Sequence, residues 1–523
     1  MKTTYQYTAF LLFPFLLLFA LVTGPSLSAQ TNTYYVDAAK ANNDGEGTSW
    51  ATAKKDLQVA LDLADAGDEI RVASGTYYPT AAPDDSTTDD RNKAFHLDKN
   101  VVLKGSYDPA TEMQDYTNPS ILSGDLGILD YTSDNAYHVF ITVNLSDATT
   151  IDGFTISDGN ADKTNSLTYS SQTFFQLYGG GLYNISSSPT ITNSTFSGNR
   201  SLIYGGGMYN NSSSPTIIFS IFSGNDAATA GGGLYNNSSS SPTITNSTFS
   251  GNSANNGGGI WSSSSSSFKI INSTFVGNTA STSGGGLYNH RSSSPTITNS
   301  TFSGNTAKNG GGMYNNDYSY PLLYNTVLYA NTADARDNLY GVINGNSSHN
   351  NASDSRDGGI DAGSGFVDLS GVDPFTDSTN PAGADGIFGT ADDGLVPSGT
   401  SPLIDAGDDA KNDEVTDITG GARVMDSAID IGAYEGQSSL SSDGPVVETI
   451  TLYPNPTSSA VYLSHATATN TNYSLYDISG KRLATYEQSG TAHQLDVSSV
   501  SKGTYILKAI SGLQVNYYRI VKE

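Results

Sequence analysis

The alternation of apolar and polar residues is most regular between Gly179 and Asn315, where one phrase recurs six times. Each copy opens with three glycines, followed by Leu, Met or Ile and an aromatic residue, and continues into short segments of alternating apolar and polar residues. The copies begin at Gly179, Gly205, Gly231, Gly257, Gly284 and Gly310, so the period is 26 residues, once lengthened to 27. Alternation at period two is typical of β-strands, and a fixed period of this length is typical of a solenoid. We expect three short strands per copy, forming one coil of a parallel β-helix.

Two positions are apolar in every copy and predict the core of this helix. One position holds Ile191, Ile217, Ile244, Ile270, Ile297 and Leu323, and the other holds Phe196, Phe222, Phe249, Phe275, Phe302 and Leu328. Coils spaced about 4.8 Å apart would stack them into continuous apolar ladders. An Asn follows each Ile by two residues, with Phe219 in its place in the second copy, so strand alternation would point it to the same side as the Ile. This orientation predicts an inward ladder of hydrogen-bonded amides.

The repeat continues upstream in a degraded form. Residues Ile151 to Ile156 align with the Ile-to-Phe segment of the regular copies. Farther upstream, Leu57 to Ala66 is rich in Leu and Ala and predicts a short helix before a strand over residues 69–72. A helix at this place would cover the open edge of the stack and protect it from edge-to-edge aggregation.

Composition and charge narrow the class of protein. The 523 residues include an apolar run from Phe10 to Val22 that is followed by small residues, which predicts a secretory signal peptide over residues 1–29. A membrane anchor is the weaker interpretation because this run is short for a bilayer span. The chain contains no cysteine, which excludes disulfides and a lipid-anchored lipoprotein. A formal charge of −27 argues against nucleic acid as a partner.

Several motifs carry a resemblance to a known architecture. They are Tyr34-Tyr35-Val36-Asp37, Gly67-Asp68-Glu69-Ile70, Ile151-Asp152-Gly153-Phe154, the Gly-Gly-Gly-Leu-Tyr-Asn repeats, Ser401-Pro402-Leu403-Ile404-Asp405-Ala406-Gly407 and Asp430-Ile431-Gly432-Ala433-Tyr434-Glu435. With them, the stretch from Tyr34 to Glu435 resembles secreted bacterial right-handed β-helix proteins of the pectin-lyase-like architecture. The resemblance implies the fold, but this architecture hosts lyases, hydrolases and adhesins, so it does not imply one activity.

A second set of motifs lies near the end of the chain. Leu452-Tyr453-Pro454-Asn455-Pro456-Thr457 opens this module, and Gly503-Thr504-Tyr505-Ile506-Leu507 precedes its last strand. The module is similar to the C-terminal sorting domain of type IX secretion, a small β-sandwich of the Bacteroidetes group. The resemblance implies Tyr453, Pro454, Asn455, Pro456, Gly503 and Tyr505 as the sorting motif. It also implies the type IX machinery as a partner, removal of the module, and release of the protein or its attachment to lipopolysaccharide at the outer-membrane cell surface.

Together these observations predict an all-β protein with four parts. Residues 1–29 are the signal peptide, and residues 30–436 form the right-handed parallel β-helix with an N-terminal capping helix. Within that helix, residues 179–333 are the regular repeats and residues 354–435 an acidic closing segment. Residues 437–445 are a linker, and residues 446–523 form the C-terminal β-sandwich.

A polysaccharide-cleaving β-helix needs paired carboxylates, or acidic calcium ligands with a Lys or Arg base, on neighbouring coils. From Gly179 to Asn315, Asp226 is the single acid. His96 and His138 lie near charged residues of the N-terminal part, but no spacing marks them as a set. We therefore predict no catalytic residue and expect a protein without enzymatic activity; if it is an enzyme, the fold favours a polysaccharide lyase or a glycoside hydrolase.

The closing segment is the candidate for a metal site, since it holds 18 Asp and Glu against 3 Lys and Arg. Acids around glycine turns are arranged as hard cations accept them. The candidate calcium ligands are Asp385, Asp392, Asp393, Asp405, Asp408 and Asp409. The alternative is a set of solvated Asx-turns that bind no ion.

Outward positions of the repeat suggest a binding surface. Strand alternation turns an aromatic column outward, consisting of Tyr183, Tyr209, Tyr235, Trp261, Tyr288 and Tyr314. Aromatic faces suit sugar rings, so we expect adhesion or binding of extracellular glycans, although the column could instead cover the flank of the helix. A lesser alternative is ice binding through a Thr-rich face around Thr190 and Thr192, which Ile218, Ile271 and Tyr324 interrupt.

Overall fold

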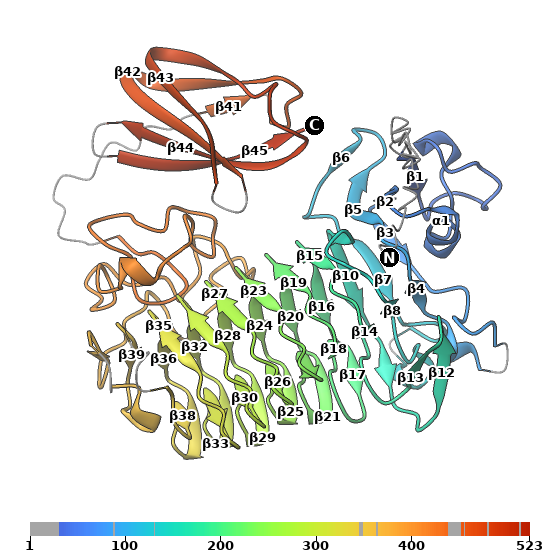
Figure 1. Ribbon diagram of the computed structural model, residues 1–523, viewed down its shortest axis with the longest axis horizontal. Helices are drawn as coiled ribbons and strands as arrows, with labels where there is room; N and C mark the ends of the chain where they lie inside the picture. The colour runs from blue at the N-terminus through green and yellow to red at the C-terminus, as the bar shows by residue number, and fades with distance from the viewer. Residues whose placement is uncertain are drawn as a thin grey trace, which may run out of the picture.

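The computed structural model describes residues 31–523, apart from residues 87–88, 130, 345–348, 362–363, 438–450, 454, 478–480 and 512–513. The predicted signal peptide and all but one residue of the predicted linker lie outside the described residues. In the described part, short parallel strands stack into a long β-helix, and a separate antiparallel module follows it (Figure 1).

Each regular coil contributes one strand to each of four parallel sheets. The first coil consists of β14 (Leu182–Ile185), β15 (Thr190–Thr192), β16 (Thr195–Ser197) and β17 (Arg200–Ser201), each paired with the same element of the next coil. The prediction of three strands per coil is therefore wrong. Asn193, with φ of 47°, turns the backbone sharply and divides one alternating segment into β15 and β16.

The four parallel sheets, numbered I to IV, extend along the axis of the β-helix. The strands of each sheet are given below in the order in which they are hydrogen-bonded to one another. Sheet I holds β1 (Thr33–Val36), β2 (Glu69–Ala73), β5 (Val102–Asp108), β9 (Thr150–Asp152), β15, β19 (Thr216–Ile218), β23 (Thr243–Thr245), β27 (Lys269–Ile271), β31 (Thr296–Thr298) and β35 (Leu322–Tyr324), with β6 (Met113–Gln114) antiparallel to β5. Sheet II holds β3 (Gly75–Tyr77), β7 (Ser120–Ser123), β10 (Phe154–Ser157), β16, β20 (Ile221–Ser223), β24 (Thr248–Ser250), β28 (Thr274–Val276), β32 (Thr301–Ser303), β36 (Val327–Tyr329), β39 (Ala352–Ser353) and β40 (Val367–Asp368). Sheet III holds β11 (Asn160–Ala161), β17, β21 (Asp226–Ala230), β25 (Ser253–Asn256), β29 (Thr279–Ser283), β33 (Thr306–Asn309) and β37 (Thr332–Ala335). Sheet IV holds β4 (Phe95–Leu97), β8 (Phe140–Val143), β14, β18 (Met208–Asn211), β22 (Leu234–Asn237), β26 (Ile260–Ser262), β30 (Leu287–Asn289), β34 (Met313–Asn315) and β38 (Leu339–Tyr340).

The predicted Ile and Phe ladders form the core. Both sets are fully buried and stand in register from coil to coil. Ring centroids of successive Phe residues from Phe196 to Phe302 lie 4.4 to 4.9 Å apart, with nearly parallel planes. Each buried Phe contributes about 1.5–3 kcal/mol from removal of apolar area, so these columns are a main source of stability.

The amide ladder lies at a different position from the predicted one. Asn193 and its equivalents adopt positive φ at the corner between sheets I and II and turn away from the core, as the 45% exposure of Phe219 shows. An inward amide ladder instead follows the Gly-Asn corners and consists of Asn199, Asn225, Asn252, Asn278, Asn305 and Asn331. From each of these to the next, Nδ2 donates to Oδ1 over 2.8 to 3.1 Å.

The predicted capping helix is present at the start of the helix. Helix α1 spans Leu57–Leu63, three residues shorter than predicted. Its buried residues Leu57, Ala60 and Leu61 join the same apolar core as Ile70 of β2. The other helical turns of the described residues are 3-10: η1 (Trp50–Thr52), η2 (Asp90–Asn92), η3 (Thr132–Asp134), η4 (Asp357–Gly359) and η5 (Asp409–Lys411).

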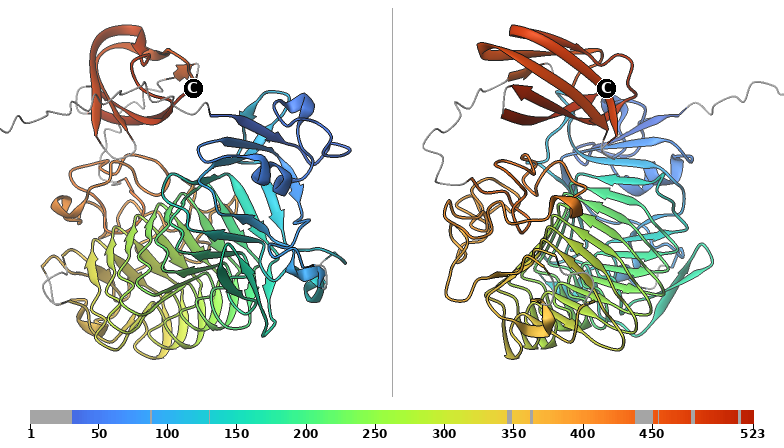
Figure 2. Two further views of the ribbon diagram at one scale, coloured as in Figure 1. Left: turned by 45° about the vertical axis from the view of Figure 1, so that its right-hand side comes forward. Right: turned by 60° about the vertical axis from the view of Figure 1, so that its left-hand side comes forward.

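After the last coils, the acidic closing segment folds back along the outer face of sheet II and the corner beside it (Figure 2). Its apolar residues Phe375, Leu403 and Ile418 pack with Val276 and Val327 of β28 and β36. Backbone and side-chain hydrogen bonds fix this position; for example, Asn272 Nδ2 donates to the Thr416 oxygen over 2.7 Å.

The C-terminal module is antiparallel. It consists of β41 (Thr451–Tyr453), β42 (Ala460–Asp477), β43 (Arg482–Asp496), β44 (Gly503–Ser511) and β45 (Gln514–Lys522). One half of β42 pairs with β41 and the other half with β44. Val461 and Leu475, one from each half, lie in a single apolar cluster, so the two halves of β42 face each other across one core.

Candidate functional site

The predicted aromatic column runs along the outer face of sheet IV. Its six members occupy equivalent positions of successive strands, and Tyr340 continues the row. Centroids of neighbouring rings lie 4.1 to 6.2 Å apart, and from Tyr209 onward the planes diverge by 6 to 25°. Tyr178 and Tyr204 form a second row, stacked on Tyr209 and Tyr235 at 5.1 and 4.4 Å.

This stacking determines which part of each ring a ligand could meet. Since successive rings are nearly parallel and their centroids lie at most 6.2 Å apart, each covers the face of the next. A sugar ring stacks on an aromatic face, where apolar surface and the negative side of the quadrupole are presented. Along the column, a ligand would therefore meet mainly the edges of the rings.

The two ends of the column differ in exposure. A β-hairpin, β12 (Ser166–Tyr169) and β13 (Gln172–Phe175), covers the first position, where the Phe174 ring meets Tyr183 at 4.9 Å. Tyr183 is 1% exposed. The next residue of the column, Tyr209, is also buried, and its burial raises the pKa of its hydroxyl to about 12. Of the six predicted residues, Trp261 and Tyr314 are half-buried and the others are buried.

One side chain that sequence reasoning missed lies beside the column. The ring of His290 is 5.6 Å from that of Trp261 and 5.9 Å from that of Tyr288. Its Nδ1 lies 3.4 Å from Oδ2 of Asp317, and burial lowers the pKa of His290 while Asp317 opposes this shift. His290 stands in a serine-rich turn, and its neighbour Asp317 belongs to the next coil, so no local spacing links the two.

The carboxylates and histidines singled out in the sequence have structural partners. Asp226 forms a solvent-exposed ion pair with Arg200, Nη2 to Oδ2 at 3.4 Å, and accepts from Ser253 Oγ. His138 is buried, its Nδ1 lies 2.9 Å from the Gly179 oxygen, and burial lowers its pKa to about 4. His96 Nδ1 lies 3.0 Å from the Ala94 oxygen. None of these contacts brings two carboxylates together.

The six candidate calcium ligands are engaged by the closing segment itself. Asp393 Oδ2 accepts from the N–H of Gly389 and from the hydroxyl of Tyr434, both over 2.6 Å. Asp385, Asp392, Asp405, Asp408 and Asp409 likewise accept backbone N–H groups. Among the residues that the structure describes, no three histidine or acidic side chains come close enough together to hold a metal ion. The acids therefore act as acceptors that fix the loops.

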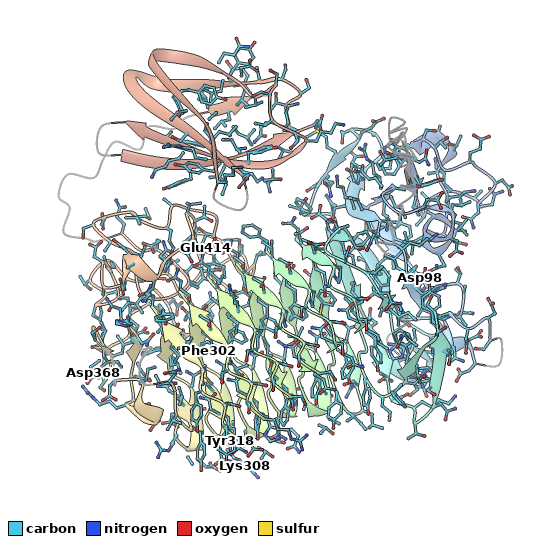
Figure 3. All side chains as sticks on the ribbon, viewed as in Figure 1. Asp98, Phe302, Lys308, Tyr318, Asp368 and Glu414 are labelled. Atoms are coloured by element: carbon cyan, nitrogen blue, oxygen red, sulfur yellow. The ribbon has the colours of Figure 1, made fainter. Side chains whose placement is uncertain are left out.

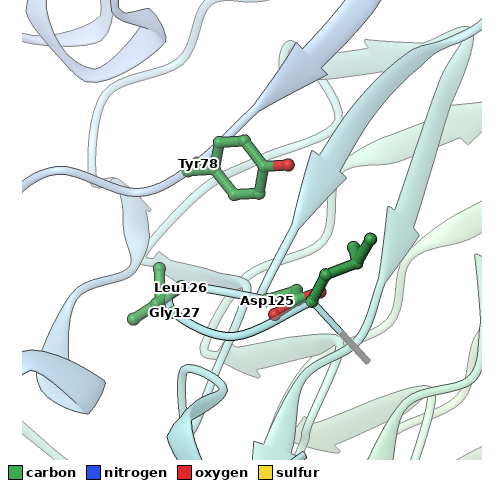
Figure 4. A pocket seen from close by; sticks show the side chains of 5 residues that line it. Tyr78, Asp125, Leu126 and Gly127 are labelled. Atoms are coloured by element: carbon green, nitrogen blue, oxygen red, sulfur yellow. The ribbon is translucent and has the colours of Figure 1, made fainter. Parts of the chain in front are cut away.

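A small depression opens among the loops near the N-terminal end, with a volume of about 250 Å³ (Figure 4). It is lined by Tyr78, Asp125, Leu126, Gly127 and Leu129. These residues supply one carboxylate, which is insufficient for the paired-acid chemistry of a glycosidase.

The predicted sorting motif is built into the C-terminal module. Asn455 joins the start of the module to β45, since Nδ2 donates to the Arg519 oxygen over 2.6 Å and Oδ1 accepts from the Val521 N–H over 2.7 Å. Tyr505 is buried, with its hydroxyl donating to the Ser501 oxygen, and Gly503 begins β44. Tyr453 lies exposed in β41, Pro456 follows Asn455, and Pro454 lies outside the described residues.

Comparisons with known proteins give two family matches. Residues 132–282 match the model of a right-handed β-helix region, and residues 451–523 match the secretion system C-terminal sorting domain. No curated protein matches the chain. A solved structure titled "Crystal structure of pectate lyase Pel9A" is similar at 17% identity and a TM-score of 0.45, over 78% of this chain and 97% of that one. A likeness of this degree says nothing about activity.

In the described part of the chain, no helix is both long and apolar enough to cross a bilayer. The sorting domain implies handling by the type IX secretion machinery and indicates secretion or attachment to the cell surface. The chain is therefore a right-handed parallel β-helix protein that carries a type IX secretion sorting domain.

Proposed function

We propose that this protein is a non-catalytic β-helix that acts outside the cell in adhesion or glycan binding. The observation that carries the proposal is the contrast between the two kinds of polar group on the repeat coils. Between Gly179 and Asn315 the single acid, Asp226, is held in an ion pair with Arg200, whereas hydroxyl and amide groups recur in register from coil to coil. Such groups bind hydroxyl-rich ligands by hydrogen bonds and provide no acid–base pair for cleavage.

Sheet I offers one such repetitive surface. Thr190, Thr216, Thr243 and Thr296 point outward in register and are half-buried, with Lys269 interrupting the row. The hydroxyls repeat at the coil spacing of about 4.8 Å, so a ligand with hydroxyl groups along its length can contact several coils at once. The neighbouring outward row contains Ile218 and Ile271, so ice binding through this face remains the lesser alternative.

The proposed export route would bring this surface to the outside of the cell. We propose that residues 1–29 are removed during export and that the linker at residues 437–445 allows removal of the C-terminal module. The β-helix would then be released or joined to surface lipopolysaccharide. In either case its outer faces meet extracellular glycans, which are hydroxyl-rich polymers of the kind that these rows can bind.

The test is to incubate the mature protein with uronate-rich and neutral polysaccharides while both binding and cleavage are measured. We expect retention on one or more glycans without new reducing ends or unsaturated sugars. Release of such products would contradict the proposal and favour a polysaccharide lyase or glycoside hydrolase. Thermal hysteresis in an ice suspension would favour the ice-binding alternative.

A further inference from the structure

A pocket lies where the closing segment meets the outer corner of the second and third regular coils. Its volume is about 110 Å³. The coils contribute Phe219, Ile221 and Asn246, and the closing segment contributes Phe388, Gly389 and Ile418. The lining thus includes two phenyl rings, two aliphatic side chains and one amide.

Phe219 is an exception among the copies of the repeat. The other five copies have Asn at this corner, and all six residues adopt a positive φ of 46 to 49°. Asn tolerates this left-handed conformation, whereas a bulky side chain adopts it at an energetic cost. Phe219 is also 45% exposed, so burial in the core does not compensate for the strain. A strained residue with an exposed aromatic ring favours a functional reason for its presence.

Asn246, the next residue along this corner, supplies the second observation. The residue is 7% exposed, and its Oδ1 atom is buried without a hydrogen-bond partner in the described structure. Farther along the same row, Asn325 Nδ2 donates to Asn299 Oδ1 over 3.0 Å. Asn246 lacks such a donor on both sides, because Asn272 donates to the closing segment instead and Phe219 has no side-chain donor. A buried amide oxygen without a partner is costly, and because the Asn246 side chain lines the pocket, a turn of its amide towards the pocket would let a ligand hydroxyl satisfy it.

The lining residues indicate the class of ligand. Phenyl rings beside an amide suit a sugar, which has apolar C–H faces and hydroxyl edges. The lining contains no Lys or Arg to neutralise a uronate. A carboxylate stands directly behind the wall, because Asp393 Oδ2 accepts from the Gly389 N–H over 2.6 Å. A sugar acid would be repelled by this charge, and a neutral sugar would not.

We propose that this pocket binds one neutral sugar residue of a glycan, with an apolar sugar face against Phe219 and Phe388 and a sugar hydroxyl on the Asn246 amide. This inference rests on the proposed function and adds a specific site and a ligand class to it. The site is separate from the aromatic column, whose ring faces are covered by neighbouring rings.

The deciding experiment compares two matched variants of the mature protein, Phe219→Asn and Tyr318→Asn. Phe219→Asn installs the residue of the other copies, so the fold should be kept. Tyr318 is likewise an exposed aromatic residue at positive φ, 62°, but it lies at the edge of the coils opposite to Glu414 of the closing segment (Figure 3). Binding is measured on an array of neutral and uronate oligosaccharides and then by titration calorimetry with the strongest neutral oligosaccharide.

We expect the unchanged protein and Tyr318→Asn to bind neutral oligosaccharides alike. Phe219→Asn should bind at least about tenfold more weakly while its melting temperature is unchanged or raised. If Phe219→Asn and the unchanged protein bound neutral glycans with equal affinity, the pocket would be overturned but the proposed function would stand. Binding of uronates alone would have the same two consequences. If the unchanged protein bound no glycan of either kind, glycan binding itself would fail.

Discussion

The guanidinium of Arg423 lies against the carboxylate of Glu435, with Nη1 3.0 Å from Oε1, and both side chains are 1% exposed. The Nη2 atom of Arg423 donates to the backbone oxygens of Asp430 and Gly432, over 3.0 and 2.7 Å. Burial raises the pKa of Glu435, and the charge of Arg423 opposes this rise. The pair lies at the end of the closing segment, where Asp417 Oδ2 also accepts from the Glu435 N–H.

Replacing Arg423 should therefore loosen the closing segment. In Arg423→Met, the buried carboxylate of Glu435 loses its counter-charge and two backbone oxygens lose their donor, which should cost about 3–5 kcal/mol. We expect faster proteolysis within residues 370–437 and a lower melting temperature. The matched control is Arg356→Met, because Arg356 pairs with Asp361 and Asp368 at the surface, where water screens ion pairs and their loss should change stability little. Equal proteolysis of the two variants would contradict a role for the buried pair.

Acidification should destabilise the β-helix through His138. Its pKa falls from 6.5 in the unfolded chain to about 4 in the folded protein, because burial disfavours the charged ring. Between these values the unfolded state binds more protons, so stability rises with pH across this window and is lost as the pH falls from 6.5 towards 4. At about 1.4 kcal/mol per pKa unit, the total is on the order of 3 kcal/mol.

The measurement is the difference in unfolding free energy between the unchanged protein and His138→Asn from pH 7 to pH 4. The difference is needed because Asp430 titrates in the same range. Burial raises the pKa of Asp430 to about 6, so its effect has the opposite sign and favours the folded state at lower pH. Asn at position 138 does not titrate, and we expect the variant to lose less stability on acidification. Parallel pH profiles would refute the assignment.

Removal of calcium should leave the stability of the closing segment unchanged. Carboxylate oxygens of all six predicted ligands already accept backbone N–H groups, as Asp405 does from Ser427 and Ala428. The donors that satisfy these oxygens belong to the chain itself, so no ion is required to hold the loops. We expect the same melting temperature in excess chelator and in millimolar calcium. A rise of several degrees with calcium would show that the acids bind an ion after all.

The sequence predicts the core of the fold well because the core obeys simple periodicity. Ile191 and Phe196 recur in register, and the coil spacing forces equivalent side chains onto each other. The prediction that Asn193 points inward is wrong. It assumes that strand alternation continues through Asn193, whereas the positive φ of this residue turns its side chain away from the core. The signal that could have corrected this is the residue type, since Asn tolerates the left-handed region in turns.

The candidate site was less predictable. The outward column from Tyr183 onward follows from strand alternation, and the covering of ring faces follows from the coil spacing. The hairpin over Tyr183 could not be predicted, because it is an insertion in a single coil. The return of the closing segment onto sheet II brings together residues that are far apart in the sequence, such as Asn272 and Thr416. A sequence rich in acids gives the same pattern for solvated loops. The Asn246 pocket exists only because these two distant parts meet.

The last prediction concerns export. Asn455 forms two hydrogen bonds to the backbone of β45, through the Arg519 oxygen and the Val521 N–H, and so ties the first loop of the sorting domain to its last strand. Asn455→Ala leaves both groups without this partner and should destabilise the module by about 1–3 kcal/mol. Because the module is the export signal, we expect a smaller fraction of the protein in the medium and on the cell surface, and a larger fraction retained inside the outer membrane. The control is Asn255→Ala in the β-helix, where an exposed amide accepts from the Ser281 and Thr282 hydroxyls and export should be normal. Quantitative immunoblots of medium, surface and periplasmic fractions distinguish the two, and normal export of Asn455→Ala would show that this hydrogen-bonded loop is dispensable for sorting.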